Sequence, residues 1–142
     1  MNTKAKEFLK GYEHADRRVR ILEEEYNKEL EMIDAVRSLS DTDGMPHGSG
    51  ISKPVEEKAI RLADKALKLA EARLEAVEER QRVFDVVSQI EGRPGEVLFE
   101  RYIKLLRWEE ICVVIHKSRN VTHGYHREGL QQGSERLEQA AR

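Results

Sequence analysis

The sequence predicts an all-α protein in which a long antiparallel helical hairpin, a coiled coil, precedes a small helix-turn-helix domain. Three observations predict this fold class. Apolar residues recur three and four residues apart over two long segments, which is the spacing of one helix face. The glycines and prolines are few, 9 and 3, and most of them are concentrated at two places. Charged residues make up 37% of the chain and aromatic residues 6%, which favours long exposed helices over a large globular core.

Residues 3–38 are expected to form one long helix with Gly11 as an isolated weak point. Its apolar residues follow heptad spacing, the signature of a seam between two supercoiled helices. Glu29 interrupts the seam, which then resumes. The seam residues are Ala5, Phe8, Tyr12, Ala15, Val19, Leu22, Tyr26, Ile33 and Val36.

Residues 54–91 are expected to form the second long helix, with Pro54 in its first turn. The preceding segment, 39–53, is rich in glycine and small polar residues and is interpreted as a linker, because a nucleotide-binding loop needs a lysine and a hydroxyl directly after its last glycine. The two helices would pair as an antiparallel hairpin over 1–91, and a second copy of the chain is expected to complete the packing as a homodimer. The seam predicted on the second helix consists of Ile60, Ala63, Leu67, Ala70, Leu74, Val77, Gln81 and Phe84.

Residues 92–142 are expected to form the helix-turn-helix domain, with 92–95 as the hinge and a first helix over 96–106. The inward residues of that helix would be Val97, Leu98, Tyr102, Leu105 and Leu106. A short helix then opens at Trp108, with Trp108, Ile111, Cys112 and Ile115 on its buried face. His116 and Lys117 break it, and Ser118 caps a second helix whose inward positions are Thr122, Tyr125, Gly129 and Leu130. The remaining residues, 131–142, either extend this helix or fray.

The distribution of charge is compatible with DNA binding. The net charge of the chain is −2, but residues 92–142 carry 9 Lys and Arg against 7 Asp and Glu, together with three histidines. This local excess is small, so a monomer is expected to bind weakly. Protonation of His123 and His126 would strengthen binding below neutral pH. The residues predicted to contact double-stranded DNA are Lys117, Ser118, Arg119, Asn120, Thr122, His123, His126 and Arg127.

The segment 98–130 resembles region 4 of bacterial sigma factors. The matching residues are Leu98, Arg101-Tyr102, Glu109-Glu110-Ile111, Ser118-Arg119 and Leu130. The whole chain, including the loop Gly44–Gly50 and the run Tyr125-His126-Arg127, is similar to a phage and prophage family of small proteins of unknown function, related to phage late-gene transcriptional activators. The resemblance implies a sequence-specific transcriptional regulator, with RNA polymerase as a further partner. The chain departs from the sigma pattern at His116, where a glycine is usual, and at Lys117, where an apolar residue is usual.

Other functions receive less support from the sequence. No convincing catalytic set is present, so neither an enzyme nor a cofactor is expected. A metal site built from Cys112, His116, His123 and His126 is the main chemical rival, since both pairs have helical spacing, but Cys112 and His123 belong to opposite faces. Two non-enzymatic alternatives remain: an assembly scaffold that contacts RNA polymerase, and a phage DNA-packaging component. One cysteine and the absence of a long apolar run are consistent with the cytoplasm rather than a membrane.

Overall fold

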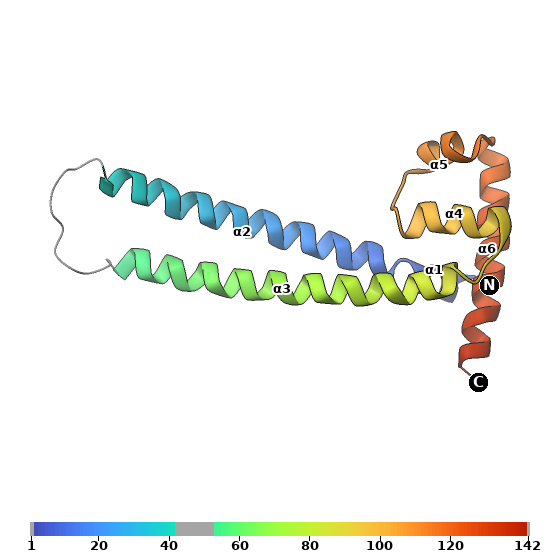
Figure 1. Ribbon diagram of the computed structural model, residues 1–142, viewed down its shortest axis with the longest axis horizontal. Coiled ribbons are helices and arrows are strands. Elements are labelled where there is room, and N and C mark those ends of the chain that lie inside the picture. The colour runs from blue at the N-terminus through green and yellow to red at the C-terminus, as the bar shows by residue number, and fades with distance from the viewer. Residues whose placement is uncertain (1, 42–52, 142) are drawn as a thin grey trace. The chain divides into compact units, whose positions relative to one another are not determined.

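The computed structural model describes residues 2–41 and 53–141, and this part of the chain is all-helical (Figure 1). The first two helices together pack antiparallel against the third, which confirms the predicted fold class. The predicted loop Gly44–Gly50 lies outside the described residues. The helices are α1 (Thr3–Leu9), α2 (Gly11–Asp41), α3 (Lys53–Val87), α4 (Gly92–Tyr102), α5 (Trp108–Ile115) and α6 (Arg119–Ala140).

Within 2–41 and 53–141, none of the helices is both long enough and apolar enough to cross a bilayer.

The predicted helix over 3–38 is divided at Lys10, next to the weak point expected at Gly11. The interruption is slight, because the amide of His14 still donates to the carbonyl of Lys10 at 3.0 Å. Gly11 lies beside Glu79 of α3: a Cβ at this position would lie 2.5 Å from Oε2 of Glu79, the end of a flexible side chain that can move aside.

The residues form two compact units, each of which makes most of its contacts within itself. The first unit comprises Met1–Asp16 with Glu75–Arg142, and the second comprises Arg17–Leu74. The base of the hairpin thus belongs with the C-terminal helices. The sequence-based boundary between 91 and 92 remains a prediction about which segment folds on its own.

In the second unit, α2 and α3 pack along a narrow apolar seam that includes the buried residues Ile33 and Leu69. Glu29 interrupts the heptad pattern of α2 at a seam position and is only 8% exposed. Its Oε2 atom accepts a hydrogen bond from Nζ of Lys65 at 3.2 Å, and Arg61 lies 4.0 Å from its Oε1 atom. These two cations compensate part of the cost of removing the carboxylate from water.

The predicted seam of α3 was wrong. Ile60, Leu67, Leu74 and Val77 are 58–66% exposed. Leu69, in contrast, is only 4% exposed and lies on the packed face of α3. The two stripes are offset by two residues, about 200° around a helix, so they lie on opposite faces. Both have heptad spacing, and spacing alone does not decide which one faces α2. The remaining buried apolar residues of α3 are Ala72, Ala76, Val83 and Val87.

The first unit has a core to which four helices contribute. The largest buried side chain is that of Tyr102 on α4, which is 1% exposed. Because α1, the end of α3, α4 and α6 all supply residues to one cluster, the helix-turn-helix rests on the base of the hairpin. The cluster consists of Leu9, Val83, Val87, Ile90, Leu98, Tyr102, Ile103 and Leu130.

Helix α4 begins earlier and ends earlier than predicted. The expected hinge, 92–95, forms its first turn, where Pro94 is compatible with the helix because first-turn amides lack intrahelical partners. Gly92 has a φ of 76°, and a Cβ on Gly95 would lie 1.9 Å from the carbonyl oxygen of Ile90. These glycines permit a sharp reversal from α3 into α4. The helix ends at Tyr102 and is followed by Leu105 in the left-handed region, with a φ of 60°.

Helix α6 crosses α4 and α1 in the first unit (Figure 1). It continues to Ala140, so the segment after Leu130 extends the helix. Gly133 does not interrupt α6. It is buried, and its Cβ position lies 3.8 Å from Cδ1 of Ile90, so this part of the helix is packed against the rest of the first unit.

Candidate nucleic-acid interface

Helix α5 is held against α4 and α6 by a small second core. Ile111 and Ile115 are buried at 0% and 1% exposure and pack with Val97 of α4. Leu106, Trp108 and Tyr125 surround this cluster. The predicted buried face of α5 is therefore confirmed at its two isoleucines, while Trp108 and Cys112 are half-buried.

The turn after α5 is made by His116 in the left-handed region, with φ 56° and ψ 45°. The amide of Lys117 donates to the carbonyl of Cys112 at 3.1 Å, and that of His116 donates to the carbonyl of Val113 at 3.3 Å. These bonds satisfy carbonyls at the end of α5, as in a helix C-cap that normally uses glycine. His116 thus occupies a left-handed turn position that glycine usually takes.

Ser118 caps α6 as predicted. Its Oγ atom accepts a hydrogen bond from the amide of Val121 at 3.3 Å. The first turn of α6 contains no acidic residue. Because free amides and the helix dipole make a helix N-terminus positive, this end of α6 is compatible with a phosphate group.

Five of the predicted DNA-contact residues lie on the surface. Asn120 and Arg127 are exposed and seven residues apart, so they share one face of α6. Gly124 lies between them, and a Cβ there would meet only the Nη2 atom of Arg127, at 4.0 Å. This outward face therefore combines polar side chains with a stretch of accessible backbone. The other exposed predicted residues are Lys117, Ser118 and Arg119.

The sequence reasoning missed Val121, which follows Asn120 and is 42% exposed. It precedes Gly124 by three residues and so belongs to the same side of α6. A helical projection of the segment would have identified it as outward. An exposed valine here offers a methyl contact, the type of contact that distinguishes thymine in the major groove.

Two predicted contact residues are buried, and their assignment was wrong. Thr122 is 0% exposed; its hydroxyl donates to the carbonyl of Ser118 at 2.8 Å and lies 3.4 Å from Sγ of Cys112. His126 is 7% exposed. Both point from α6 into the first unit, because they lie on the face that packs against the other helices. Neither side chain can reach a nucleic acid in this arrangement.

His126 is held neutral by its surroundings. Its Nε2 atom lies 2.7 Å from the hydroxyl of Tyr102, and its ring meets that of Trp108 edge-on at 4.7 Å. Burial, and then the nearby cations beginning with Lys6, lower the pKa of His126 to about 4. His126 therefore carries no positive charge just below neutral pH, where its protonation was expected to strengthen DNA binding.

His123 is half-buried and packs against Trp108, with ring centroids 4.5 Å apart. The guanidinium carbon of Arg101 lies 5.2 Å from the Trp108 ring, and Nη1 of Arg101 donates to the carbonyl of Leu106 at 2.9 Å. Trp108 is thus in contact with groups from α4 and α6. His123 contributes to this packing and presents only part of its ring outward.

The rival metal site gains no support. Throughout 2–41 and 53–141, no three His, Cys, Asp or Glu side chains are grouped so that they could hold a metal ion. Of the four residues considered, Cys112 contacts Thr122 and His116 is an exposed turn residue. His123 packs on Trp108, and His126 is hydrogen-bonded to Tyr102.

No protein-family model matches the chain, and the searches found neither a curated protein nor a solved structure that matches it.

Proposed function

We propose that this protein is a non-enzymatic, sequence-specific regulator of transcription that binds double-stranded DNA through the start of α6. The observation that carries the proposal is the helix-turn-helix itself. α5 and α6 are joined by the left-handed turn at His116 and the Ser118 cap, while Asn120 and Arg127 remain exposed. This type of unit places its second helix in the major groove.

The exposed residues suit different parts of a duplex. Arg119 and Asn120 lie in the first turn of α6, where a recognition helix usually contacts base edges; Arg can be bidentate to guanine and Asn to adenine. Lys117 precedes the helix and Arg127 lies two turns along it, which suits contacts with phosphates that fix orientation. Gly124 would let the α6 backbone approach the floor of the groove.

The resemblance of 98–130 to region 4 of sigma factors supports the same function. Under this proposal the protein acts in the cytoplasm on phage or prophage promoters, in the manner of late-gene activators. The buried apolar positions and the polar outward positions of α6 are compatible with such a unit.

Selection of bound sequences from a random duplex pool, followed by a shift assay at two salt concentrations, tests this function. We expect enrichment of a defined sequence and an affinity that falls steeply with salt, since phosphate contacts release counterions. The double variant Arg119→Ala with Asn120→Ala should lose the preference for the selected sequence and retain its helical content. If no sequence is enriched from the pool, or if this variant binds the selected sequence as the unmodified protein does, the proposal is overturned.

A matched control is available on the same helix. Gln132 and Arg136 are exposed on α6, well beyond the proposed contact region. The variant Gln132→Ala with Arg136→Ala removes one amide and one guanidinium, as the test variant does. It should bind the selected sequence like the unmodified protein.

One observation favours an additional protein partner. Val113 and Val114 are 72% and 45% exposed on α5, next to each other and outside both cores of the first unit. Exposed aliphatic side chains of this kind are suited to a protein contact, and RNA polymerase is the partner that the sigma resemblance implies. The variant Val113→Ser with Val114→Ser should keep DNA binding but lose polymerase recruitment. Loss of DNA binding would instead assign these valines to the duplex interface.

A further inference from the structure

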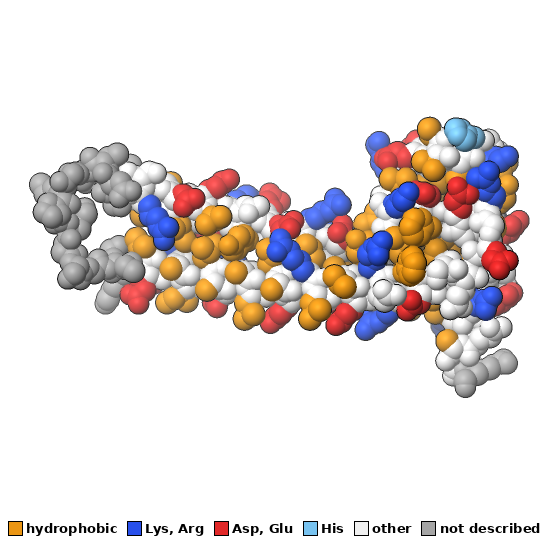
Figure 2. Space-filling view, in the orientation of Figure 1, with side chains coloured by type: hydrophobic (Ala, Val, Ile, Leu, Met, Phe, Trp, Pro, Cys, Tyr) orange, Lys and Arg blue, Asp and Glu red, His pale blue; other side chains and the backbone are white. Residues whose placement is uncertain are grey.

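Helix α3 carries an apolar stripe that no described part of its hairpin covers. In the second unit, Ile60, Leu67 and Leu74 are 58–61% exposed, and Ala63 and Ala70 between them are exposed as well. We call these five residues the outer stripe. Figure 2 shows hydrophobic and acidic side chains alternating along this edge of α3. Val77, 66% exposed, continues the same spacing along the helix.

The outer stripe has the periodicity of a coiled-coil seam. Its residues alternate three and four apart, with Ile60, Leu67 and Leu74 at one heptad position and Ala63 and Ala70 at the other. A partner that fits it must present an equivalent stripe on a helix. The exposed apolar residues of α2, Ile21, Leu30 and Met32, do not form a heptad series. Among the described helices, only α3 itself supplies the complement.

The flanking charges select an orientation. Counting the large stripe residues as heptad position a, every described e position of α3 from residue 64 on is acidic, whereas positions g include arginines but no acid. A parallel pair places e of one helix beside g of the other, and an antiparallel pair places e beside e. The e residues are Asp64, Glu71, Glu78 and Asp85, and the g residues are Ala66, Arg73, Arg80 and Val87.

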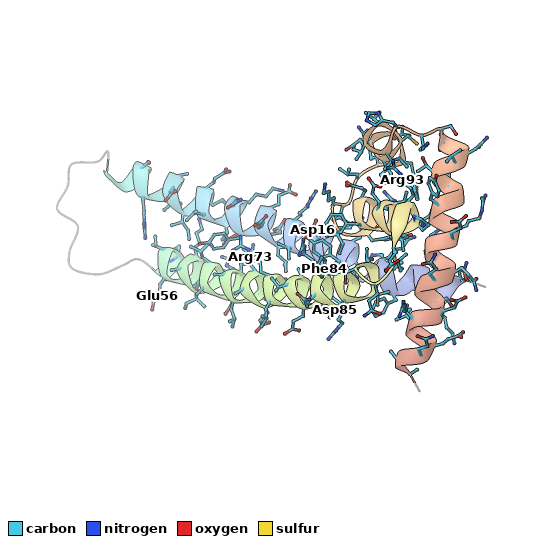
Figure 3. All side chains as sticks on the ribbon, turned by 45° about the vertical axis from the view of Figure 1, so that its right-hand side comes forward. Asp16, Glu56, Arg73, Phe84, Asp85 and Arg93 are labelled. Carbon is cyan, nitrogen blue, oxygen red and sulfur yellow. The ribbon has the colours of Figure 1, made fainter. Side chains whose placement is uncertain are left out.

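We infer that α3 pairs in parallel with α3 of a second copy of this chain through the outer stripe. Parallel pairing avoids opposing rows of carboxylates and brings Arg80 of each copy near Asp85 of the other. Arg73 extends toward α2, where it donates to Glu23 at 2.6 Å, so it also holds the hairpin together (Figure 3).

The pairing has a consequence that rests on the proposed function. The C-terminal end of α3 shares a core with α4 and α6 through Val83 and Val87. A parallel pair therefore carries both helix-turn-helix units at the same end, and such a dimer would read a DNA site with two half-sites. An antiparallel pair would place the two helix-turn-helix motifs, one from each copy, at opposite ends of the paired helices.

Sedimentation of the full chain over a range of concentrations, without DNA, tests the pairing. We expect a monomer–dimer equilibrium that the variant Leu67→Glu with Leu74→Glu weakens at least tenfold, with unchanged circular dichroism because both residues are exposed. The control Ile21→Glu with Met32→Glu, also at exposed apolar positions, should keep the dimer. A monomer at every concentration, or an association that persists in the stripe variant, would overturn the inference.

Cysteine cross-linking tests the orientation. In a Cys112→Ala background, the variants Ile60→Cys and Leu74→Cys should each form disulfide-linked homodimers, because parallel pairing places each position opposite itself. Cross-linking that occurs only when the two variants are mixed would show an antiparallel pair and reject the orientation. Neither measurement involves DNA. A result that rejects the pairing of α3 is therefore distinct from a result that rejects the proposed DNA binding.

Discussion

The hydroxyl of Tyr102 on α4 lies 2.7 Å from the Nε2 atom of His126 on α6, and both side chains are buried. Burial raises the pKa of Tyr102 to about 12 and lowers that of His126 to about 4. At neutral pH both groups are therefore uncharged, and a hydrogen bond joins the tyrosine hydroxyl to the imidazole. This bond links α6 to α4.

Removal of the tyrosine hydroxyl should destabilise the first unit without altering its surface. In Tyr102→Phe, the Nε2 atom of His126 loses its hydrogen-bond partner while remaining buried, which should lower the free energy of unfolding by about 1–3 kcal/mol. Urea denaturation measures this change. Sequence preference in DNA binding should be retained under conditions where the variant is folded. A stability equal to that of the unmodified protein would show that the bond contributes little.

The pH dependence of stability should contain a contribution from His126. Its pKa is about 4 in the folded protein, against the ordinary value of 6.5. Between these values the unfolded chain binds more protons than the folded one, so the free energy of unfolding decreases as pH falls from 6.5 toward 4. Thermal unfolding should show a melting temperature that falls by several degrees over this window.

The variant His126→Gln should flatten that part of the pH profile, because glutamine can still form a hydrogen bond but does not titrate. His14 is exposed on α2 and serves as the control. The variant His14→Gln should keep the slope of the unmodified protein. Equal slopes for all three proteins would contradict the assignment to His126.

The left-handed turn at His116 should respond to backbone preference. His116→Gly relieves the steric cost of φ 56° and should raise the free energy of unfolding by up to about 1 kcal/mol, partly offset by the greater freedom of glycine in the unfolded chain. His116→Val, which is β-branched, should lower it by about 1 kcal/mol or more. Chemical denaturation of both variants measures these free energies of unfolding. If the valine variant is more stable than the glycine variant, the turn at His116 is not strained.

Two glycines of α6 should respond oppositely to the same substitution. A Cβ on Gly129 would lie 2.8 Å and 2.9 Å from carbons of the buried Leu98, so Gly129→Ala should destabilise by about 1–3 kcal/mol. Gly124 has space for a methyl group, and Gly124→Ala should stabilise the helix by about 0.5–1 kcal/mol. Thermal melts of the two variants compare them directly. Destabilisation by both would mean that α6 lies closer to another surface at Gly124.

The sequence was sufficient where a local rule acts alone. Ser118 caps α6 because a serine hydroxyl before a helix accepts from its free amides, and the structure has that bond. The weak point at Gly11 and the buried face of α5 follow in the same way from single residues and their spacing. The surface position of Asn120 and Arg127 was likewise evident from the helical period.

Other features depended on what each residue meets in three dimensions. The heptad pattern of α3 contains two stripes, and only the packing of Leu69 rather than Leu67 identifies the inner one. His126 is polar and adjacent to the exposed Arg127. Its burial is possible because it forms a hydrogen bond with the hydroxyl of Tyr102, 24 positions away. Neither partner is visible from spacing along the chain.

By itself the sequence determined the helical class, the hairpin and the helix-turn-helix, because propensity, capping and periodicity act over a few residues. Only the tertiary structure decided which face of α3 is packed and which polar groups of α6 remain outside. That decision depends on contacts between residues distant in sequence, since burial becomes favourable only where a complementary surface is present.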